Sequence, residues 1–417
     1  MTSMESRVGL HEAPVSPVLR PQRPNFMSVL TRGAAALPLA SLLFLAACGP
    51  AADELLPGLE DPEVSTIEDE LALAKRAAVF TLSNDFDNAV LIFKRGRDGR
   101  LTPAGLASTG GIGSGGSLGS QGALALSPNE RWMVAVNPGS DEISLLTVMG
   151  TELRVTDRAP SGGERPISAT FRNGLVYVLN AGGAGNVSGF RVDSVGRLRP
   201  IAGATRPLSG IDSEPAQVSL SADLRTLVVT ERAAGAITTY AVSGDGSLGN
   251  PTVVASSGPT PSGFALTSGG TLVVAEAFDA LPGLGAVSSY RVGLGPAPVL
   301  VSDSVRNLQT STSWVVAASS GARAYASNPP AGTISGYSVD TVGRITLFPD
   351  GGHTAETGNG SMPSDLAVTH GSRFLYVLEA GVHDLGAFQV LSNGALVPIQ
   401  GIGTGGLPLS AAGLVAI

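Results

Sequence analysis

The chain has 417 residues, of which 43% are hydrophobic, 14% are charged and 5% are aromatic, with 55 glycines and one cysteine. This composition excludes a disordered chain, which carries more charge, a collagen, which needs glycine at every third position, and a disulfide framework. With 26 basic and 34 acidic residues the net charge is −8, so no nucleic-acid partner is expected, because such a partner requires clustered positive charge.

The first predicted element is a signal peptide within residues 1–47. An apolar run at 33–44 is too short for a transmembrane helix, which needs about 20 apolar residues, and has the length of a signal-peptide core. The following Leu-Ala-Ala-Cys48-Gly resembles the lipobox of bacterial lipoproteins. That resemblance implies that Cys48 is lipidated and anchors the protein in a bacterial cell envelope. The alternative is an ordinary cleavage site.

Two further expectations concern this end of the chain. Translation starts at Met1, Met4 or Met27, and the residues before Met27 are an untranslated leader in the last case. The residue after Cys48 is glycine, not the aspartate that retains lipoproteins at the inner membrane, so the outer membrane is favoured, with a periplasmic or surface-exposed domain.

Residues 48–77 are predicted to form an acidic tether. The stretch 49–64 is rich in proline, glycine and acidic residues, and such a composition buries too little apolar surface to fold. Ser65 and Glu68 form a capping-box pattern, and acidic residues precede basic ones, as the helix dipole prefers. A short helix is therefore expected over 65–76.

From residue 78 onward the sequence repeats a unit of about 49 residues, a period that indicates a solenoid, a propeller or an array. The clearest part of each unit is a β-rich run that ends in asparagine or glutamate. The seven end residues are Asn84, Asn137, Asn180, Glu231, Glu276, Asn328 and Glu379.

Each unit continues in the same way after its end residue. A polar turn leads to a strand that usually ends in an aromatic residue, and a glycine turn such as Asp245-Gly246 follows, because hairpin turns need positive φ. A fourth strand often begins at a proline, namely Pro166, Pro215, Pro261 or Pro363. Four short strands in each of seven units predict an all-β fold over 78–417, a seven-bladed β-propeller.

The two ends of the repeat region predict how the ring closes. The first unit starts directly at its second strand, near Ala78, whereas a spare strand segment, Pro408 to Ile417, follows the last unit. This segment is expected to complete blade one without a covalent link. An open β-solenoid and a pair of β-sandwiches are the alternatives, but neither explains a strand missing at one end and added at the other.

The repeat pattern Leu-Tyr-Val-x-Asn/Glu, Gly-x-Ile-Ser-x-Tyr/Phe and Asp-x-x-Gly-x-Leu resembles that of lactonase-type seven-bladed propellers. This family includes 6-phosphogluconolactonase-like and carboxymuconate-cyclizing proteins, so the resemblance implies an activity on lactones. Members often have an Asn-Arg-Gly turn, for which Glu231-Arg232-Ala233 is the nearest match. They also often have an Arg-His pair after a proline that opens a central strand. Here the residues after those prolines are Ile167, Ala216, Ser262 and Ser364.

Charged side chains are expected on the face that carries the loops between second and third strands and the connections between blades. They are Arg165, Glu214, Glu231, Arg232, Glu276, Asp365, Glu379 and His383. Among these, Glu231 and Glu276 are the acid/base candidates for opening or closing a sugar-acid or muconate-type lactone. The substrate-binding candidates are Arg165, Arg232 and Glu379. The alternative is that the three glutamates replace turn-holding asparagines.

No cofactor or metal ion is expected. The segment 111–116 fits a dinucleotide-binding glycine pattern and 115–119 a nucleophile-elbow string, but both patterns need a following helix, whereas a strand is expected. No histidine pair has metal-ligand spacing. Trp132 and Trp314 are expected to pack between blades, with a sugar platform as the alternative.

Two hypotheses therefore remain for a monomeric envelope protein. One is a lactonase-like enzyme for a small-molecule lactone, and the other is a non-catalytic scaffold that binds an envelope protein or a glycan.

Overall fold

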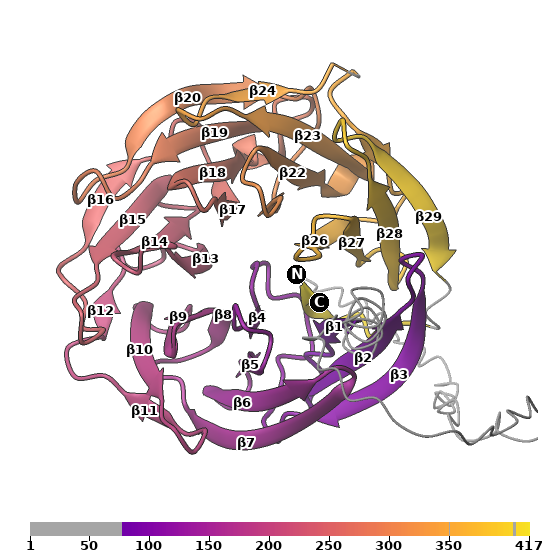
Figure 1. The fold of residues 1–417 in the computed structure, drawn as a ribbon. Coiled ribbons are helices and arrows are strands. Elements are labelled where there is room, and N and C mark those ends of the chain that lie inside the picture. Colours follow the sequence, from indigo (N-terminus) through magenta and orange to yellow (C-terminus); the bar gives the residue numbers. More distant parts are fainter. Residues whose placement is uncertain (1–76, 350, 403–405) are drawn as a thin grey trace, which may run out of the picture. The chain divides into compact units, whose positions relative to one another are not determined.

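The computed structural model describes residues 77–349, 351–402 and 406–417. Cys48, the predicted signal peptide and the tether with its helix lie outside these ranges. The described residues form seven antiparallel sheets arranged in a ring (Figure 1). This arrangement confirms the predicted seven-bladed β-propeller. None of the helices within the described ranges has the length and apolar character to cross a membrane.

The strands of each blade follow one another from the centre of the ring outward. Blade one contains β30 (Ala412–Ala416), β1 (Ala78–Leu82), β2 (Ala89–Arg95) and β3 (Leu101–Ser108), and blade two contains β4 (Leu124–Leu126), β5 (Trp132–Asn137), β6 (Glu142–Met149) and β7 (Glu152–Pro160). Blade three contains β8 (Pro166–Arg172), β9 (Leu175–Asn180), β10 (Asn186–Val192) and β11 (Leu198–Pro200), with β12 (Arg206–Pro207) also paired to β10. Blade four contains β13 (Pro215–Leu220), β14 (Thr226–Glu231), β15 (Ala236–Ala241) and β16 (Thr252–Ala255).

The other three blades repeat this order. Blade five contains β17 (Pro261–Leu266), β18 (Thr271–Glu276), β19 (Ala286–Arg291) and β20 (Val299–Arg306). Blade six contains β21 (Val315–Ala317), β22 (Arg323–Asn328), β23 (Thr333–Val339) and β24 (Ile345–Leu347), with β25 (Ala355–Glu356) also paired to β23. Blade seven contains β26 (Pro363–Val368), β27 (Phe374–Glu379), β28 (Asp384–Val390) and β29 (Leu396–Ile402). Short 3₁₀ turns, η1 (Phe278–Ala280) and η2 (Pro329–Ala331), follow β18 and β22.

The ring closes as the sequence predicts. The last strand, β30, pairs antiparallel with β1, so that Ala416 lies opposite Val79. The Thr81 hydroxyl donates to the Gly413 carbonyl at 2.7 Å, and the Ile417 amide donates to the Ala78 carbonyl at 2.8 Å. Because β30 contacts the innermost strands of blades two and seven as well, the first and last described strands hold the ring together.

Aromatic residues join neighbouring blades. The hydroxyls of the buried Tyr177, Tyr325 and Tyr376 donate at 2.8 to 2.9 Å to the carbonyls of Gly246, Gly394 and Gly99, each in the outer hairpin turn of the next blade. These glycines have φ between 84° and 93°, a backbone conformation that strongly favours glycine. The predicted glycine turns are thus both hairpin turns and contact points between blades.

A cavity of about 580 Å³ runs along the centre of the ring. All seven innermost strands line it, mainly with alanine, valine, leucine and phenylalanine side chains. Polar side chains line it as well, among them those of Gln121, Arg172, Gln217 and His370.

Candidate functional site

The loops between second and third strands and the connections between blades lie at the same end of the strands. In blade three, for example, Pro166 at the start of β8 pairs with Asn180 at the end of β9, which pairs with Asn186 at the start of β10. We call this end the connection face and the opposite end the hairpin face. The predicted functional residues all belong to the connection face or to the strand ends beneath it.

The segment between β3 and β4, residues 109–123, crosses the channel at the connection face, and we call it the plug. In Figure 1 it reaches into the middle of the ring. The Gln121 side chain donates to the Val315 carbonyl at 3.0 Å and accepts from the Val315 amide at 3.1 Å. Ser120 donates to the Ile167 carbonyl at 2.8 Å, and the Arg232 guanidinium donates to the Gly119 carbonyl. The plug therefore connects blades three, four and six across the channel.

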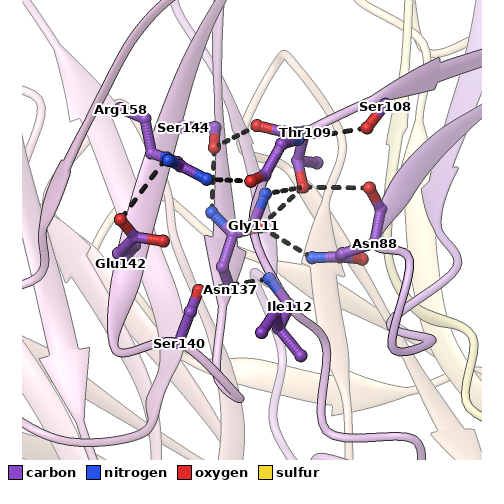
Figure 2. Close-up of polar contacts among 11 residues, drawn as sticks. Asn88, Ser108, Thr109, Gly111, Ile112, Asn137, Ser140, Glu142, Ser144 and Arg158 are labelled. Atoms are coloured by element: carbon purple, nitrogen blue, oxygen red, sulfur yellow. Dashed lines mark hydrogen bonds and ion pairs between the residues drawn. The ribbon is translucent and has the colours of Figure 1, made fainter.

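The base of the plug is fixed by Asn137, the end residue of β5. The Thr109 hydroxyl and the Asn88 amide group donate to its side-chain oxygen at 2.7 and 2.9 Å, and its own amide group donates to the Ser144 hydroxyl at 2.8 Å (Figure 2). Asn137 thus holds a connection between blades through its side chain, which is the role expected for a turn-holding residue.

Two more contacts hold the beginning of the plug. Arg158 donates to the Gly110 carbonyl and forms an ion pair with Glu142 at 3.3 Å, while the Ile112 amide donates to the Ser140 hydroxyl at 3.1 Å (Figure 2). These bonds show that the glycine-rich segment is an anchored part of the fold.

The glycines of the plug allow close backbone contact with blade one. A Cβ atom on Gly113 would lie 2.3 Å from the carbonyl carbon and oxygen of Asn84. The Gly113 amide donates to the Asp85 carbonyl at 2.9 Å. Because larger residues cannot approach the backbone this closely, packing explains the glycine pattern that superficially resembles a nucleotide-binding motif.

Glu231, one of the two acid/base candidates, is fully buried at the end of β14. One of its carboxylate oxygens accepts from the amide and the hydroxyl of Ser209 at 3.1 and 2.6 Å, and the other accepts from the Thr238 hydroxyl. Its carboxylate therefore joins the blade connection to the third strand, as Asn137 does in blade two.

Glu276, the other acid/base candidate, has a similar environment at the end of β18 and is also fully buried. It accepts from the Gly258 amide and the Ser288 hydroxyl, both at 2.7 Å. It further accepts from Ser256 at 3.2 Å and from Ser304 at 2.5 Å. Both of its oxygens are occupied by groups of the protein.

Replacing Glu276 with alanine is expected to lower the free energy of unfolding by at least about 2 kcal/mol, because buried donors lose a charged acceptor. Chemical denaturation measures this change. The matched control is Glu152→Ala on the exposed outer strand β7, for which a change below about 0.5 kcal/mol is expected. Equal stability of both variants, with activity lost only in Glu276→Ala, would contradict the structural role.

Glu379 differs from the other six end residues. It is half-buried at the end of β27, and no described group donates a hydrogen bond to its carboxylate. Gly386 occupies the third-strand position that Ser144 or Ser335 fills in other blades, so the hydroxyl partner is missing. Burial, and then the charge of Asp384, raise the pKa of Glu379 to about 7. This carboxyl group can thus exchange a proton near neutral pH.

A polar pocket of about 340 Å³ lies on the connection face between blades three and four. Arg165, Arg232, Asp212 and Glu214 line it, together with the glycine-rich loop after β9. The structure therefore brings together two predicted substrate-binding residues, Arg165 and Arg232. Glu231, Glu276 and Glu379 do not line this pocket.

The two arginines of this pocket can pair with an anionic group of a ligand, beside the carboxylates of Asp212 and Glu214. The pKa of the half-buried Arg232 is lowered, mainly by burial; Glu214 opposes this shift and Arg165 adds to it. Arg165 is exposed, and its side chain bonds to no described group. Two guanidinium groups near one another repel, and a carboxylate or phosphate between them relieves that repulsion while accepting charge-assisted hydrogen bonds.

The residues that precede innermost-strand prolines have left-handed backbones. Arg165 and Glu214 have φ of 52° and 50°, and Thr260 and Met362, at the same position in other blades, have 54° and 49°. Because Thr260 and Met362 have this conformation outside the pocket, it belongs to the repeat and is no sign of catalysis. Arg165 and Glu214, which have this left-handed conformation, are both exposed on the connection face.

Sequence reasoning missed Asp212 and the plug. Asp212 stands two residues before Glu214 in the connection that leads to Pro215, which is the one local signal for it. Among the described residues, no group of three or more histidine, cysteine, aspartate or glutamate side chains is placed to hold a metal ion.

Comparison with known proteins agrees with the fold. Residues 184–279 match the family model described as "Lactonase, 7-bladed beta-propeller", a segment that includes much of the polar pocket. The resemblance to lactonase-type propellers drawn from the repeat pattern is thereby confirmed. No curated protein matches the chain.

Several solved structures share the architecture at low identity. A Lactobacillus plantarum protein is 17% identical, with a TM-score of 0.65 over 82% of this chain and 99% of its own. A putative 6-phosphogluconolactonase from Bacteroides fragilis is 15% identical, with a TM-score of 0.62 and the same coverage. The Pseudomonas aeruginosa periplasmic gluconolactonase is 14% identical, with a TM-score of 0.59, again over 82% and 99%. At such identities the similarity establishes the fold alone.

Proposed function

We propose that this protein hydrolyses a sugar-acid or muconate-type lactone in the polar pocket between blades three and four. The observation that carries the proposal is that two arginines and two carboxylates converge on one small hollow. The partial match to a lactonase family model and the gluconolactonase-like neighbours in fold support it.

The roles follow from the positions of the side chains. Arg165 and Arg232 hold the carboxylate or phosphate of the substrate through charge-assisted hydrogen bonds. Glu214 accepts a proton from the water molecule that attacks the lactone carbonyl. The bond between the carbonyl carbon and the ring oxygen breaks, the protonated Glu214 returns its proton to the ring oxygen, and the product is an open-chain hydroxy acid.

The test is the rate of ring opening for 6-phosphogluconolactone, gluconolactone and muconolactone, corrected for spontaneous hydrolysis. Glu214→Gln is expected to lower kcat about 10²- to 10⁴-fold, because it removes the base. Arg165→Met is expected to lower kcat/KM about 10- to 100-fold, because it removes a charged contact.

The matched control for the arginine is Arg344→Met, which changes an exposed arginine on the hairpin face and is expected to leave the rate unchanged. Turnover that survives both pocket substitutions would contradict the proposed site. Arg232 is less suitable for this test because it also holds the plug.

A second candidate function is a non-catalytic scaffold that binds an envelope protein or a glycan. Two observations favour it: the plug crosses the channel, and Glu231 and Glu276 are buried with their oxygens occupied. Absence of turnover on every lactone, in a protein with a normal unfolding transition, would favour the scaffold. Capture of a partner by the immobilised propeller would then be the next measurement.

We also propose that Cys48 carries a lipid that anchors the protein to a bacterial envelope membrane. The lipobox-like segment Leu-Ala-Ala-Cys48-Gly supports this proposal. The Cys48→Ser protein is expected to lose incorporation of labelled palmitate and to leave the membrane fraction. Unchanged labelling of that variant would contradict lipidation at Cys48.

A further inference from the structure

Blade three departs from the repeat at the hairpin turn between its first two strands. In four other blades a serine or threonine follows the first strand, and its hydroxyl oxygen accepts a hydrogen bond from the backbone amide of the residue that begins the second strand. These pairs are Ser127 with Trp132 at 3.0 Å, Ser221 with Thr226 at 2.9 Å, Thr267 with Thr271 at 3.0 Å and Thr369 with Phe374 at 3.2 Å. Blade three instead has Arg172, followed by the short turn Asn173-Gly174.

This shorter turn is an ordinary hairpin turn. Asn173 and Gly174 have φ of 50° and 74°, the positive pair that asparagine-glycine turns favour. A hollow of about 480 Å³ opens beside it on the hairpin face, lined in part by Trp132, Arg172, Asn173 and Asn129. Trp132 also lines a second hollow of about 470 Å³. The indole ring therefore borders two hollows.

Trp132 packs on the outer hairpin turn of blade three. A Cβ atom on Gly196 of blade three would lie 2.6 Å from the indole ring, so the ring packs directly on that turn. Phe374 of blade seven packs on Gly99 in the same way, but it is 2% exposed and the guanidinium groups of Arg373 and Arg95 lie 5.1 and 5.3 Å from its ring centre. Within the described ranges no arginine covers Trp132 in this way, and its ring remains partly exposed.

Arg172 has a charge that the described residues do not neutralise. It is half-buried, its side chain bonds to no described acceptor, and burial lowers its pKa. Asp193, the carboxylate lining the same hollow, is already paired with Arg199 at 3.0 Å and accepts the Arg197 amide at 2.9 Å. An unpaired guanidinium in a hollow is a natural partner for an anionic ligand.

We propose that this hollow on the hairpin face binds a carboxylated pyranose, a uronic-acid unit that is either a free sugar or part of a polysaccharide. The carboxylate pairs with the Arg172 guanidinium, and the C–H face of the sugar ring packs on the Trp132 indole. Asn173 and the amide nitrogen of Asn129, which make no hydrogen bond within the described residues, face the sugar hydroxyls. This site is independent of the lactone pocket on the connection face.

The test is a calorimetric titration of the purified protein with glucuronate, glucose, galacturonate and a galacturonate trimer. Glucuronate is expected to bind at least about tenfold more tightly than glucose, because only the acid pairs with Arg172. Arg172→Gln is expected to weaken glucuronate binding by about 10- to 100-fold, to the level of glucose. Trimer binding that is tighter than monomer binding would assign the site to a polysaccharide, and equal binding would assign it to the free sugar.

Two controls separate this site from others. Arg344→Gln changes the residue of blade six that matches Arg197 and is expected to leave glucuronate binding unchanged. Binding of glucuronate is also expected to change the tryptophan fluorescence of the protein. Trp132→Phe keeps an aromatic ring and is expected to remove this change, because the other tryptophan, Trp314, is 7% exposed. The proposal is overturned if glucuronate and glucose bind equally, or if Arg172→Gln binds glucuronate like the unchanged protein.

Discussion

Replacing Leu414 with alanine is expected to lower the free energy of unfolding by about 2–5 kcal/mol, the range for truncating a buried leucine. Leu414 lies on β30, is 6% exposed and packs in one cluster with Val79 of blade one and Leu378 of blade seven. Because β30 closes the ring by pairing with β1, the first described strand, the cavity weakens this closure. Urea denaturation followed by circular dichroism measures the change.

Leu409 provides the matched control, five residues earlier in the chain. It is 80% exposed, so Leu409→Ala is expected to change the free energy of unfolding by less than about 0.5 kcal/mol. A similar decrease in the free energy of unfolding for Leu414→Ala and Leu409→Ala would contradict a role of β30 in stabilising the closed ring.

Replacing Asp365 with asparagine is expected to stabilise the protein at pH 8 and to flatten the pH dependence of its stability. Asp365 lies on β26, is 2% exposed and has one buried oxygen without a hydrogen-bond partner. Burial raises the pKa of this carboxyl to about 8, although the Leu366 amide, at 2.7 Å from the other oxygen, favours the charged form. Like the Leu366 amide, three further groups lower the pKa of Asp365, namely the backbone amides of Gly122 and Leu414 and the side chain of Gln121.

The sign of the pH effect follows from the proton balance. The usual pKa of 3.8 applies to the unfolded chain, so between about pH 4 and pH 8 the folded protein holds a proton that the unfolded chain releases. Stability therefore falls as pH rises through this window, by up to about 1.4 kcal/mol per pH unit from this group. Asparagine cannot ionise, so that contribution disappears.

Denaturation curves at pH 5, 6.5 and 8 test this expectation. The control is Asp87→Asn, which changes an exposed aspartate in the loop between β1 and β2 and is expected to leave the slope with pH unchanged. An unchanged slope in Asp365→Asn as well would show that Asp365 is ionised in the folded protein at pH 5 to 8.

The fold was predictable because its local chemistry recurs seven times. The β-rich runs before Asn84 and its six counterparts, the glycine turns such as Gly246 and the prolines such as Pro363 each have a local physical cause that can be read from neighbouring residues. Ring closure was predictable too, because a strand missing near Ala78 and a spare strand near Leu414 compensate each other.

The candidate site was less predictable because it depends on contacts between distant parts of the chain. Nothing near Gln121 in sequence indicates that its side chain bonds to Val315, 194 residues away. The repeat position alone also does not distinguish Glu276, whose oxygens are occupied, from Glu379, whose hydroxyl partner is replaced by Gly386. In contrast, the repeat order does predict that Arg165 and Arg232 lie on the same face, and the structure shows that they line one pocket there.

The most direct test of the central claim is a crystal structure of the protein with bound 6-phosphogluconate, the product that would result from ring opening of the phosphorylated lactone. The account predicts that its phosphate lies between the guanidinium groups of Arg165 and Arg232, with Glu214 near the carboxylate carbon. A ligand bound in the central channel, with Arg165 and Arg232 free of contacts to it, would contradict the account.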